Sequence, residues 1–281
     1  MSTKPVTLAG VCGWPIHHSL SPVLHNFWLR ELGISGAYVH FAVHPLEAVE
    51  AFKSLKNTSI TGVNVTIPLK KLAFQAADEH TPDALKLGVA NCLYKRDGKL
   101  VAHNTDMEGF AAPLLAKLGP KTIMKSAAVI IGTGGASRAV IGALIAMGVP
   151  EIRICGRTEE KAEQIISDIS LPNVHRLPWA NRTIGLKGAG LIINSSAGGM
   201  AGKAALDLDL TYTEKTACVY DLVYTPLKTP LLRNAERKGL QTIGGLDMLI
   251  AQARPAFKLF YKAEPSDDLD PKPVLLKALK G

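Results

Sequence analysis

A glycine-rich loop lies between an apolar run of strand length and an apolar segment of helical length. Residues Ala127–Ile131 lead into Gly132, Gly134 and Gly135, and Ser137 stands where the third glycine of a G-x-G-x-x-G pattern would be. Glycine permits the tight turn from strand to helix, and the N–H groups at the start of the helix bind a pyrophosphate. The pattern predicts a dinucleotide site, with an ordinary strand-to-helix turn as the alternative.

The next expected strand ends without the acidic residue that is typical of NAD sites. The strand Glu151–Ile154 is followed closely by Gly156, Arg157 and Thr158, with no Asp or Glu at its tip. An acid there would hold the ribose hydroxyls of NAD. The planar guanidinium of Arg157 instead suits a 2′-phosphate, and Thr158 is placed to cap the next helix and to contact that phosphate. A solvated arginine and an ordinary cap are the alternative, but together the residues favour NADP(H).

Two serines stand at the start of the first expected helix. We expect Ser21 at the N-cap and Pro22 at the first helical position, and capping alone would explain Ser21. Ser19 is not needed for capping. Two hydroxyls beside the free N–H groups and the positive dipole end of a helix form a natural carboxylate site.

Two adjacent lysines are expected where positive charge is unfavourable. If Pro68 starts a helix, Lys70 and Lys71 lie in its first turn, where a cation opposes the helix macrodipole. Departures of this kind often mark function, although the sequence does not decide which lysine is functional. Asp106 is expected near the start of a later helix. It is either an ordinary cap or the carboxylate of an acid–base pair with Lys70.

The composition indicates a folded protein with an anionic partner, and the pattern of charges favours a small one. The 281 residues are 47% hydrophobic and 20% charged, and 32 Lys and Arg against 24 Asp and Glu give a net charge of +8. The basic residues are scattered, and the longest basic clusters are pairs, so neither a nucleic-acid arm nor a membrane-binding patch is expected. A diffuse positive field suits the steering of small anions.

The cysteines and histidines predict neither a disulfide framework nor a metal site. The four cysteines are widely spaced, no C-x-x-C occurs, and the histidines lack a metal-binding spacing. We therefore expect reduced thiols in a cytoplasmic protein. The start of the chain resembles neither a secretory signal nor an anchor, and the longest apolar run, Ala139–Val149, is too short to span a bilayer.

Strand-like runs alternate with helical segments, which predicts an α/β protein with mostly parallel, helix-covered sheets. The turn Asp97-Gly98 marks a hairpin. The expected strands are Val6–Cys12, Ala37–Val43, Ile60–Val65, Leu93–Arg96, Lys99–Ala102, Ala127–Ile131, Glu151–Ile154, Leu191–Ile193 and Val219–Asp221. The expected helices are Pro22–Leu32, Leu46–Leu55, Glu108–Leu118, Ser137–Met147, Glu159–Ile169, Thr229–Lys238 and Leu246 to about Ala263. Two units meet near Asp106–Gly109, and periodicity does not assign the last helices to either unit.

In their order along the chain, these motifs resemble the shikimate dehydrogenase family over nearly the whole length. The segments that carry the resemblance are Gly13–Pro22, Asn64–Lys70, Asn104–Asp106, Gly132–Arg138, Arg157–Thr158, Tyr220–Tyr224 and Gly245–Gln252. The resemblance implies an N-terminal α/β substrate domain completed by C-terminal helices, plus a Rossmann-type NADP-binding domain. It places the substrate domain at 1–107 with 245–281, and the NADP-binding domain at 108–244.

The resemblance also implies an activity: the reversible, NADPH-linked reduction of 3-dehydroshikimate to shikimate on the route to aromatic amino acids. Lys70 matches the catalytic lysine of the family and Asp106 its partner, and they handle the proton at the developing alkoxide while hydride reaches the ring carbonyl carbon. We expect a monomer or a homodimer that binds small molecules.

Further residues match positions that bind the substrate or the cofactor in this family. The matched substrate-binding residues are Ser19, Ser21 and Tyr224 for the carboxylate, and Thr66, Asn91 and Gln252 for the ring hydroxyls. The matched cofactor-binding residues are Gly132, Gly134, Gly135, Ala136, Arg157, Thr158, Gly245 and Met248.

The chain departs from the family pattern at three places. Gly156 replaces the Asn of an Asn-Arg-Thr run, Val89–Cys92 replaces Ala-Val-Asn-Thr, and Asn194–Met200 is looser than the usual Asn-Ala-Thr stretch. These departures leave room for a quinate/shikimate dehydrogenase paralogue, including one that uses NAD. A non-catalytic NADP-binding sensor is the alternative of another class. The joint presence of Lys70 and Asp106 argues against it, because a pure binder does not need this pair.

Overall fold

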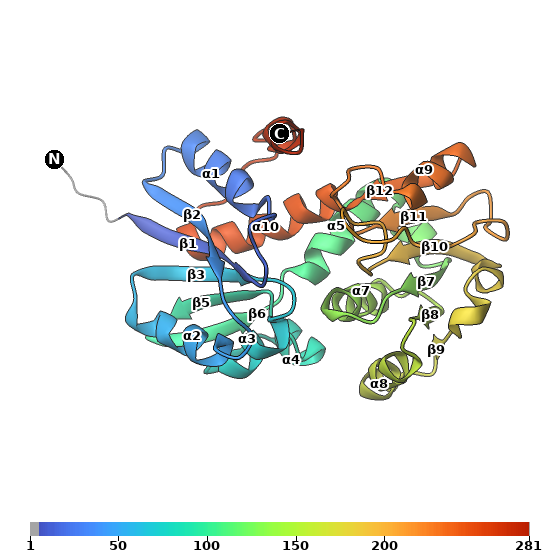
Figure 1. The fold of residues 1–281 in the computed structure, drawn as a ribbon, viewed down its shortest axis with the longest axis horizontal. Coiled ribbons are helices and arrows are strands. Elements are labelled where there is room, and N and C mark those ends of the chain that lie inside the picture. Colours follow the sequence, from blue (N-terminus) through green and yellow to red (C-terminus); the bar gives the residue numbers. More distant parts are fainter. Residues whose placement is uncertain (1–5, 281) are drawn as a thin grey trace. The chain divides into compact units, whose positions relative to one another are not determined.

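The computed structural model describes residues 6–280, which divide into two compact units along the chain (Figure 1). The first unit runs up to Asp106 and resumes at Ile250, and the second runs from Met107 to Leu249. The chain therefore leaves the first unit, forms the second and returns. The domains expected at 1–107 with 245–281 and at 108–244 stay a prediction as substrate-binding and cofactor-binding domains.

The first unit is built on a mixed sheet of six strands in the order β2-β1-β3-β5-β6-β4. Its strands are β1 (Thr7–Gly13), β2 (Gly36–Ala42), β3 (Ile60–Val65), β4 (Glu79–His80), β5 (Cys92–Arg96) and β6 (Lys99–His103). Strands β1, β2 and β3 are parallel, whereas β5 runs antiparallel to both β3 and β6. The predicted hairpin turn is confirmed between β5 and β6, where Asp97 and Gly98 both have positive φ.

Helices cover both faces of this sheet (Figure 1). One face packs against α2 (Ala48–Ser54), α3 (Lys70–Ala76) and α4 (Pro82–Leu87) through a core that includes Val63 and Leu93. The other face carries α1 (Ser21–Glu31), the end of α10 (Gly245–Tyr261) and α11 (Lys272–Ala278).

A glycine in the sheet explains how α10 packs in this unit. Phe260 of α10 lies directly against Gly62 of β3, because a Cβ at Gly62 would stand 2.5 Å from the Phe260 ring. Phe257 and Phe260 also surround His25 of α1 together with Tyr38 of β2. These contacts bury a large aromatic surface and complete the first unit with residues from the end of the chain.

The second unit contains a six-stranded sheet in which every adjacent pair is parallel. Its strands are β7 (Ala127–Ile131), β8 (Ile152–Cys155), β9 (Val174–Arg176), β10 (Ala189–Asn194), β11 (Cys218–Asp221) and β12 (Gln241–Gly244). Read from β9, the order is third, second, first, fourth, fifth and sixth strand of the unit, which is the order of the doubly wound dinucleotide-binding fold. The expected α/β fold is thus confirmed.

The strands of the second unit are apolar because both faces of the sheet are covered. Along β7, Ala128 and Ile130 face one core while Val129 and Ile131 face the other. The helices of this unit are α5 (Asp106–Leu118), α6 (Pro120–Ile123), α7 (Gly135–Ala146), α8 (Glu159–Ile169) and α9 (Pro230–Arg237). Short 3₁₀ turns occur at Leu55–Asn57, Trp179–Asn181 and Ile184–Leu186. Within residues 6–280 no helix has both the length and the apolar character needed to cross a membrane.

The sequence misses three short strands, β4, β9 and β12, which have two to four residues each. Runs this short show no alternation, and their pairing depends on the neighbouring strand. Several helix starts are also shifted by one or two residues: for example, α1 begins at Ser21 rather than Pro22, and α3 begins at Lys70 rather than Pro68.

Candidate functional site

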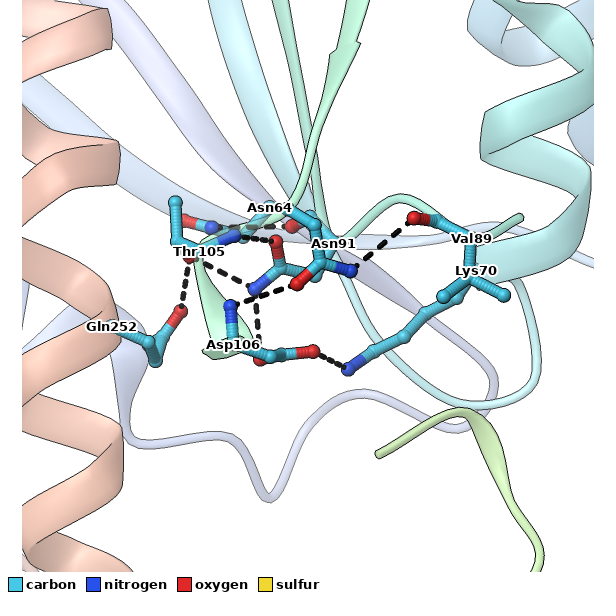
Figure 2. A network of polar contacts seen from close by, with 8 residues as sticks. Asn64, Lys70, Val89, Asn91, Thr105, Asp106 and Gln252 are labelled. Atoms are coloured by element: carbon cyan, nitrogen blue, oxygen red, sulfur yellow. Dashed lines mark hydrogen bonds and ion pairs between the residues drawn. The ribbon is translucent and has the colours of Figure 1, made fainter. Parts of the chain in front are cut away.

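Lys70 and Asp106 form an ion pair in the first unit (Figure 2). The Nζ of Lys70 lies 2.5 Å from Oδ2 of Asp106, and the two side chains are 14% and 7% exposed. Lys70 is the first residue of α3 and Asp106 the first residue of α5. Lys71 is exposed. The structure therefore selects Lys70 as the lysine that faces the carboxylate.

The topology of the sheet explains why residues far apart in sequence meet here. Lys70 follows β3 and Asp106 follows β6, and both strands run in one direction because β5 is antiparallel to each. Asn91 directly precedes β5, so it lies at the same edge where β3 and β6 end. Ser19 follows β1, which is parallel to β3. The carboxyl ends of parallel strands are where open α/β sheets place their ligands.

Asn91 holds Asp106 in place. Its side-chain NH₂ group donates a 2.8 Å hydrogen bond to Oδ1 of Asp106 and a 2.9 Å hydrogen bond to the Thr105 hydroxyl. Its side-chain oxygen, Oδ1, accepts a 2.7 Å hydrogen bond from the Thr105 N–H. The Asp106 N–H donates to Oδ1 of Asn104, and the Thr105 hydroxyl donates 3.3 Å to Oε1 of Gln252. Figure 2 shows this network converging on the carboxylate. It brings together three predicted site residues, Asn91, Asp106 and Gln252.

Two members of the network, Asn64 and Tyr38, have no predicted role. The Asn64 side chain donates a 3.2 Å hydrogen bond to the backbone carbonyl of Asn91 and accepts a 2.7 Å hydrogen bond from the Tyr38 hydroxyl. Burial raises the pKa of Tyr38 well above its usual range, with smaller contributions from Tyr261, Cys12 and Cys92, so this hydroxyl stays a donor. The signal for Asn64 was an amide inside an otherwise apolar strand, because a buried amide must find hydrogen-bond partners.

Ser21 does not occupy the capping position that the sequence predicts. Ser21 is the first residue of α1, the N-cap is Leu20, and no side chain caps this helix end in the standard position. Instead, the Ser19 hydroxyl accepts from the Ser21 N–H at 3.3 Å and donates to the Ser21 hydroxyl at 3.2 Å. The expectation that Ser21 is the N-cap was wrong. The hydroxyls nevertheless lie side by side, as a shared carboxylate site requires.

Thr66 lies at the same edge of the sheet. It directly follows β3 and is half-buried, and its N–H donates to the carbonyl of Cys12 at 2.9 Å. Its methyl group packs against Gly13, where a Cβ would stand 2.8 Å away. Thr66 is thereby fixed beside the end of β1, the strand that leads to Ser19.

The glycine-rich loop of the second unit has the predicted form. Gly132 directly follows β7 and has a φ of +129°, and a Cβ there would stand 2.7 Å from the Ser195 hydroxyl, so only glycine fits. Gly134 is the N-cap of α7, and no side chain forms a capping hydrogen bond there. A Cβ at Gly134 would meet no atom within 4 Å. The space beside Gly134, at the start of α7, is therefore open. Ser137 replaces the third glycine and forms a 2.9 Å hydrogen bond with Ser195.

Arg157 and Thr158 are exposed at the tip of β8. Thr158 is the N-cap of α8 as expected, but its side chain makes no capping hydrogen bond, which corrects that part of the prediction. Glu159, the first acid after the tip, is paired with Arg176. The tip thus presents a guanidinium and a hydroxyl, and its nearest carboxylate on α8 already has a cationic partner.

The remaining predicted site residues also lie in the second unit. Ala136 is half-buried in the first turn of α7, and Tyr224 is half-buried in the loop after β11. Gly245 begins α10 and packs closely on Leu222, whose carbonyl oxygen a Cβ would meet at 2.2 Å. Met248 is 8% exposed and belongs to the core. The roles of these four residues in binding stay predictions.

A buried carboxylate, Asp221, supports the loop that carries Tyr224 and has no predicted role. Asp221 accepts from the Asn194 amide, the Val223 N–H and the Thr229 hydroxyl at 2.9, 3.0 and 2.6 Å. Burial raises the pKa of Asp221, and these three hydrogen bonds oppose that shift. Among residues 6–280 no group of three or more His, Cys, Asp or Glu side chains could hold a metal ion.

Comparisons with known proteins agree with one another. A family profile for the shikimate dehydrogenase substrate binding domain matches residues 11–93, and one for shikimate / quinate 5-dehydrogenase matches residues 114–201. The shikimate dehydrogenase (NADP(+)) of Paramagnetospirillum magneticum is 41% identical over 265 residues, 93% of this chain and 96% of that protein.

Two solved structures extend the comparison to the fold. The shikimate 5-dehydrogenase of Thermus thermophilus, in complex with NADP(H) and shikimate, is 32% identical with a TM-score of 0.82, over 98% of this chain and 99% of that one. The shikimate 5-dehydrogenase of Listeria monocytogenes, in complex with shikimate and NAD, is 29% identical with a TM-score of 0.84, over 96% of each chain.

Proposed function

The chain belongs to the shikimate dehydrogenase family, and from this premise we propose that it interconverts 3-dehydroshikimate and shikimate with NADP(H) in aromatic amino-acid biosynthesis. The observation that carries the proposal is the Lys70–Asp106 pair, joined at 2.5 Å at the edge of the first sheet. A cation and a carboxylate held together and partly shielded from water are suited to proton transfer. A protein that only bound NADP would not need them.

Lys70 and Asp106 manage the proton in this proposal. In the reducing direction the Lys70 ammonium donates a proton to the ring oxygen as negative charge develops on it, and in the oxidising direction the amine accepts that proton. Asp106 orients Lys70 through Oδ2 and contacts a ring hydroxyl. Since Asn91 fixes the other oxygen of Asp106 at 2.8 Å, the pair needs little reorganisation during the reaction.

The hydroxyls around this pair bind the substrate. Ser19 and Ser21 hold the carboxylate at the start of α1, with Tyr224 as a further partner, while Thr66, Asn91 and Gln252 contact ring hydroxyls. The support for this arrangement is that Ser19, Thr66 and Asn91 are attached to strand ends at one edge of the first sheet.

The second unit holds the cofactor, which supplies the hydride when bound. The open approach to Gly134 leaves room for a pyrophosphate at the start of α7, and Gly132 permits the turn. Arg157 binds the 2′-phosphate at the tip of β8, where no acid competes with it. These features fit NADP better than NAD. Ala136, Thr158, Gly245 and Met248 complete the proposed cofactor site.

The proposal also covers location and assembly. A cytoplasmic setting is supported by four buried cysteines, all of them free thiols. We propose a monomer or a homodimer without nucleic-acid or membrane partners, since the basic residues form no run longer than a pair. Sedimentation at several protein concentrations tests the assembly.

A single assay tests the activity. The purified protein is incubated with shikimate or quinate and with NADP⁺ or NAD⁺, and the absorbance of the reduced nicotinamide is followed. We expect the highest kcat/KM with shikimate and NADP⁺. Turnover chiefly with quinate and NAD⁺ would support the paralogue instead, and no turnover in any combination would contradict the enzyme proposal.

A further inference from the structure

Thr133, the residue between the first two glycines of the loop, covers Gly156 at the tip of β8. A Cβ at Gly156 would stand 2.6 Å from the methyl carbon of Thr133 and 3.3 Å from its hydroxyl oxygen. Gly156 does not have a positive φ, so its backbone would accept other residues. The space is closed by Thr133, and the two positions are therefore a complementary pair.

This pair of residues lies where the cofactor's adenosine ribose is expected to bind. The loop after β7 and the tip of β8 are adjacent, since the Gly132 N–H donates 2.8 Å to the carbonyl of Cys155. In a sheet of this order, the tip of the second strand meets the 2′ position of the adenosine ribose. Here the residue at the tip, Gly156, has no side chain, and the methyl group of Thr133 from the neighbouring loop occupies the space and brings the Thr133 hydroxyl to the tip.

Three polar side chains at the tip have no partner among residues 6–280. Within the described part of the chain, neither the Thr133 hydroxyl nor the side chains of Arg157 and Thr158 form a hydrogen bond or an ion pair. Glu159 is held by Arg176, so it is not free to accept from a ribose hydroxyl. The tip therefore offers donors and a positive charge, which match a phosphate better than a neutral 2′-hydroxyl.

We propose that Thr133 is a specificity-determining residue for NADP(H). Its hydroxyl donates to the 2′-phosphate beside Arg157, and its methyl group, packed on Gly156, fixes the side-chain rotamer so that little entropy is lost on binding. This inference rests on the proposed function, because it assigns one more residue to the proposed cofactor site.

Two substitutions separate the hydroxyl from the methyl group. Thr133→Val keeps the methyl group and removes the hydroxyl, whereas Thr133→Ser does the reverse. Dissociation constants of NADP⁺ and NAD⁺ are measured by calorimetry without substrate. For T133V we expect roughly tenfold weaker binding of NADP⁺, since one hydrogen bond to a charged group is lost, and unchanged binding of NAD⁺. T133S should keep the preference of the unmodified protein.

Gly156→Ala tests the packing independently. The new methyl group meets Thr133 and should weaken NADP⁺ binding in the natural background, while in the T133S background the same change should be tolerated. Circular dichroism and thermal melting confirm that each variant is folded. If the unmodified protein binds NAD⁺ better than NADP⁺, the proposed cofactor is wrong. If it prefers NADP⁺ and T133V keeps that preference, this inference alone is overturned.

Discussion

The side-chain amide of Asn91 donates a 2.8 Å hydrogen bond to the oxygen of Asp106 that does not contact Lys70. The carboxylate is thus held from two sides, and its second oxygen is aimed at the lysine. Asn91 is 3% exposed and is itself fixed by two hydrogen bonds to Thr105. The position of the proton-handling pair is therefore set by residues that precede β5 and follow β6.

Replacing Lys70 should affect the rate far more than substrate binding. We expect Lys70→Ala to lower kcat by about 10²- to 10⁴-fold, the usual contribution of a positioned acid–base group, with a much smaller change in KM for shikimate. Steady-state kinetics measure both. The adjacent, exposed Lys71 provides a matched control, and Lys71→Ala should retain activity. A loss confined to KM in the Lys70 variant would mean that Lys70 only binds substrate.

Asn91→Ala should lower both stability and activity. The change leaves the buried N–H of Thr105 and one oxygen of Asp106 without a partner, which costs about 1–3 kcal/mol of unfolding free energy. Urea titration measures this loss, and kcat should fall because Asp106 loses its support. Asn26 is the control, since it pairs with the backbone of Tyr38 rather than with Asp106. Asn26→Ala should lower stability alone, and an equal loss of kcat there would argue against a positioning role for Asn91.

The glycine loop predicts two different effects of alanine. Gly132→Ala should destabilise the protein without cofactor by about 1–2 kcal/mol, because alanine resists a positive φ and meets Ser195 at 2.7 Å. Gly134→Ala should leave that stability nearly unchanged, since no atom lies within 4 Å, but should weaken NADP⁺ and NAD⁺ alike. Thermal melting and calorimetry distinguish the two effects. Equal melting temperatures for both variants would contradict this account of the loop.

Acid should destabilise the first unit through His25. This side chain is fully buried among aromatic rings, and neither ring nitrogen has a hydrogen-bond partner among the described residues. Burial lowers its pKa from 6.5 to about 3. Below pH 6.5 the imidazole of His25 therefore becomes protonated in the unfolded chain but stays neutral in the folded chain. Protonation favours the unfolded state, so the folded protein loses stability as pH falls from about 6.5 towards about 3.

His25→Phe should remove this pH dependence. Between pH 7 and pH 5 we expect the unmodified protein to lose about 2 kcal/mol more unfolding free energy than the variant, as measured by urea titration at both pH values. The exposed His175 is the control, and His175→Gln should keep the slope of the unmodified protein. Parallel pH curves for the unmodified protein and the His25 variant would contradict the prediction.

Local sequence patterns predicted most of the secondary structure. The expected bounds of β7 and α8 agree with the structure, because a long apolar run and a strong helical period are both local signals. Local signals failed at the start of α1. Serine is a common capping residue, yet Ser21 does not cap α1, and its N–H instead donates to the Ser19 hydroxyl. The path of the preceding loop decides which hydroxyl is within reach of this N–H.

The sequence by itself determined the chemistry that is available: a glycine loop before a helix, a second strand without an acid, and a lysine and an aspartate of suitable types. The resemblance already pointed to Lys70 and Asp106, but only the tertiary structure showed that Lys70 contacts Asp106, 36 residues away, and that Thr133 covers Gly156. The physical reason is that spacing along a chain does not fix the distance between side chains. The direction of β5 against β3 and β6 places Lys70 near Asp106, and the pairing of β7 with β8 places Thr133 near Gly156; both depend on contacts throughout each sheet.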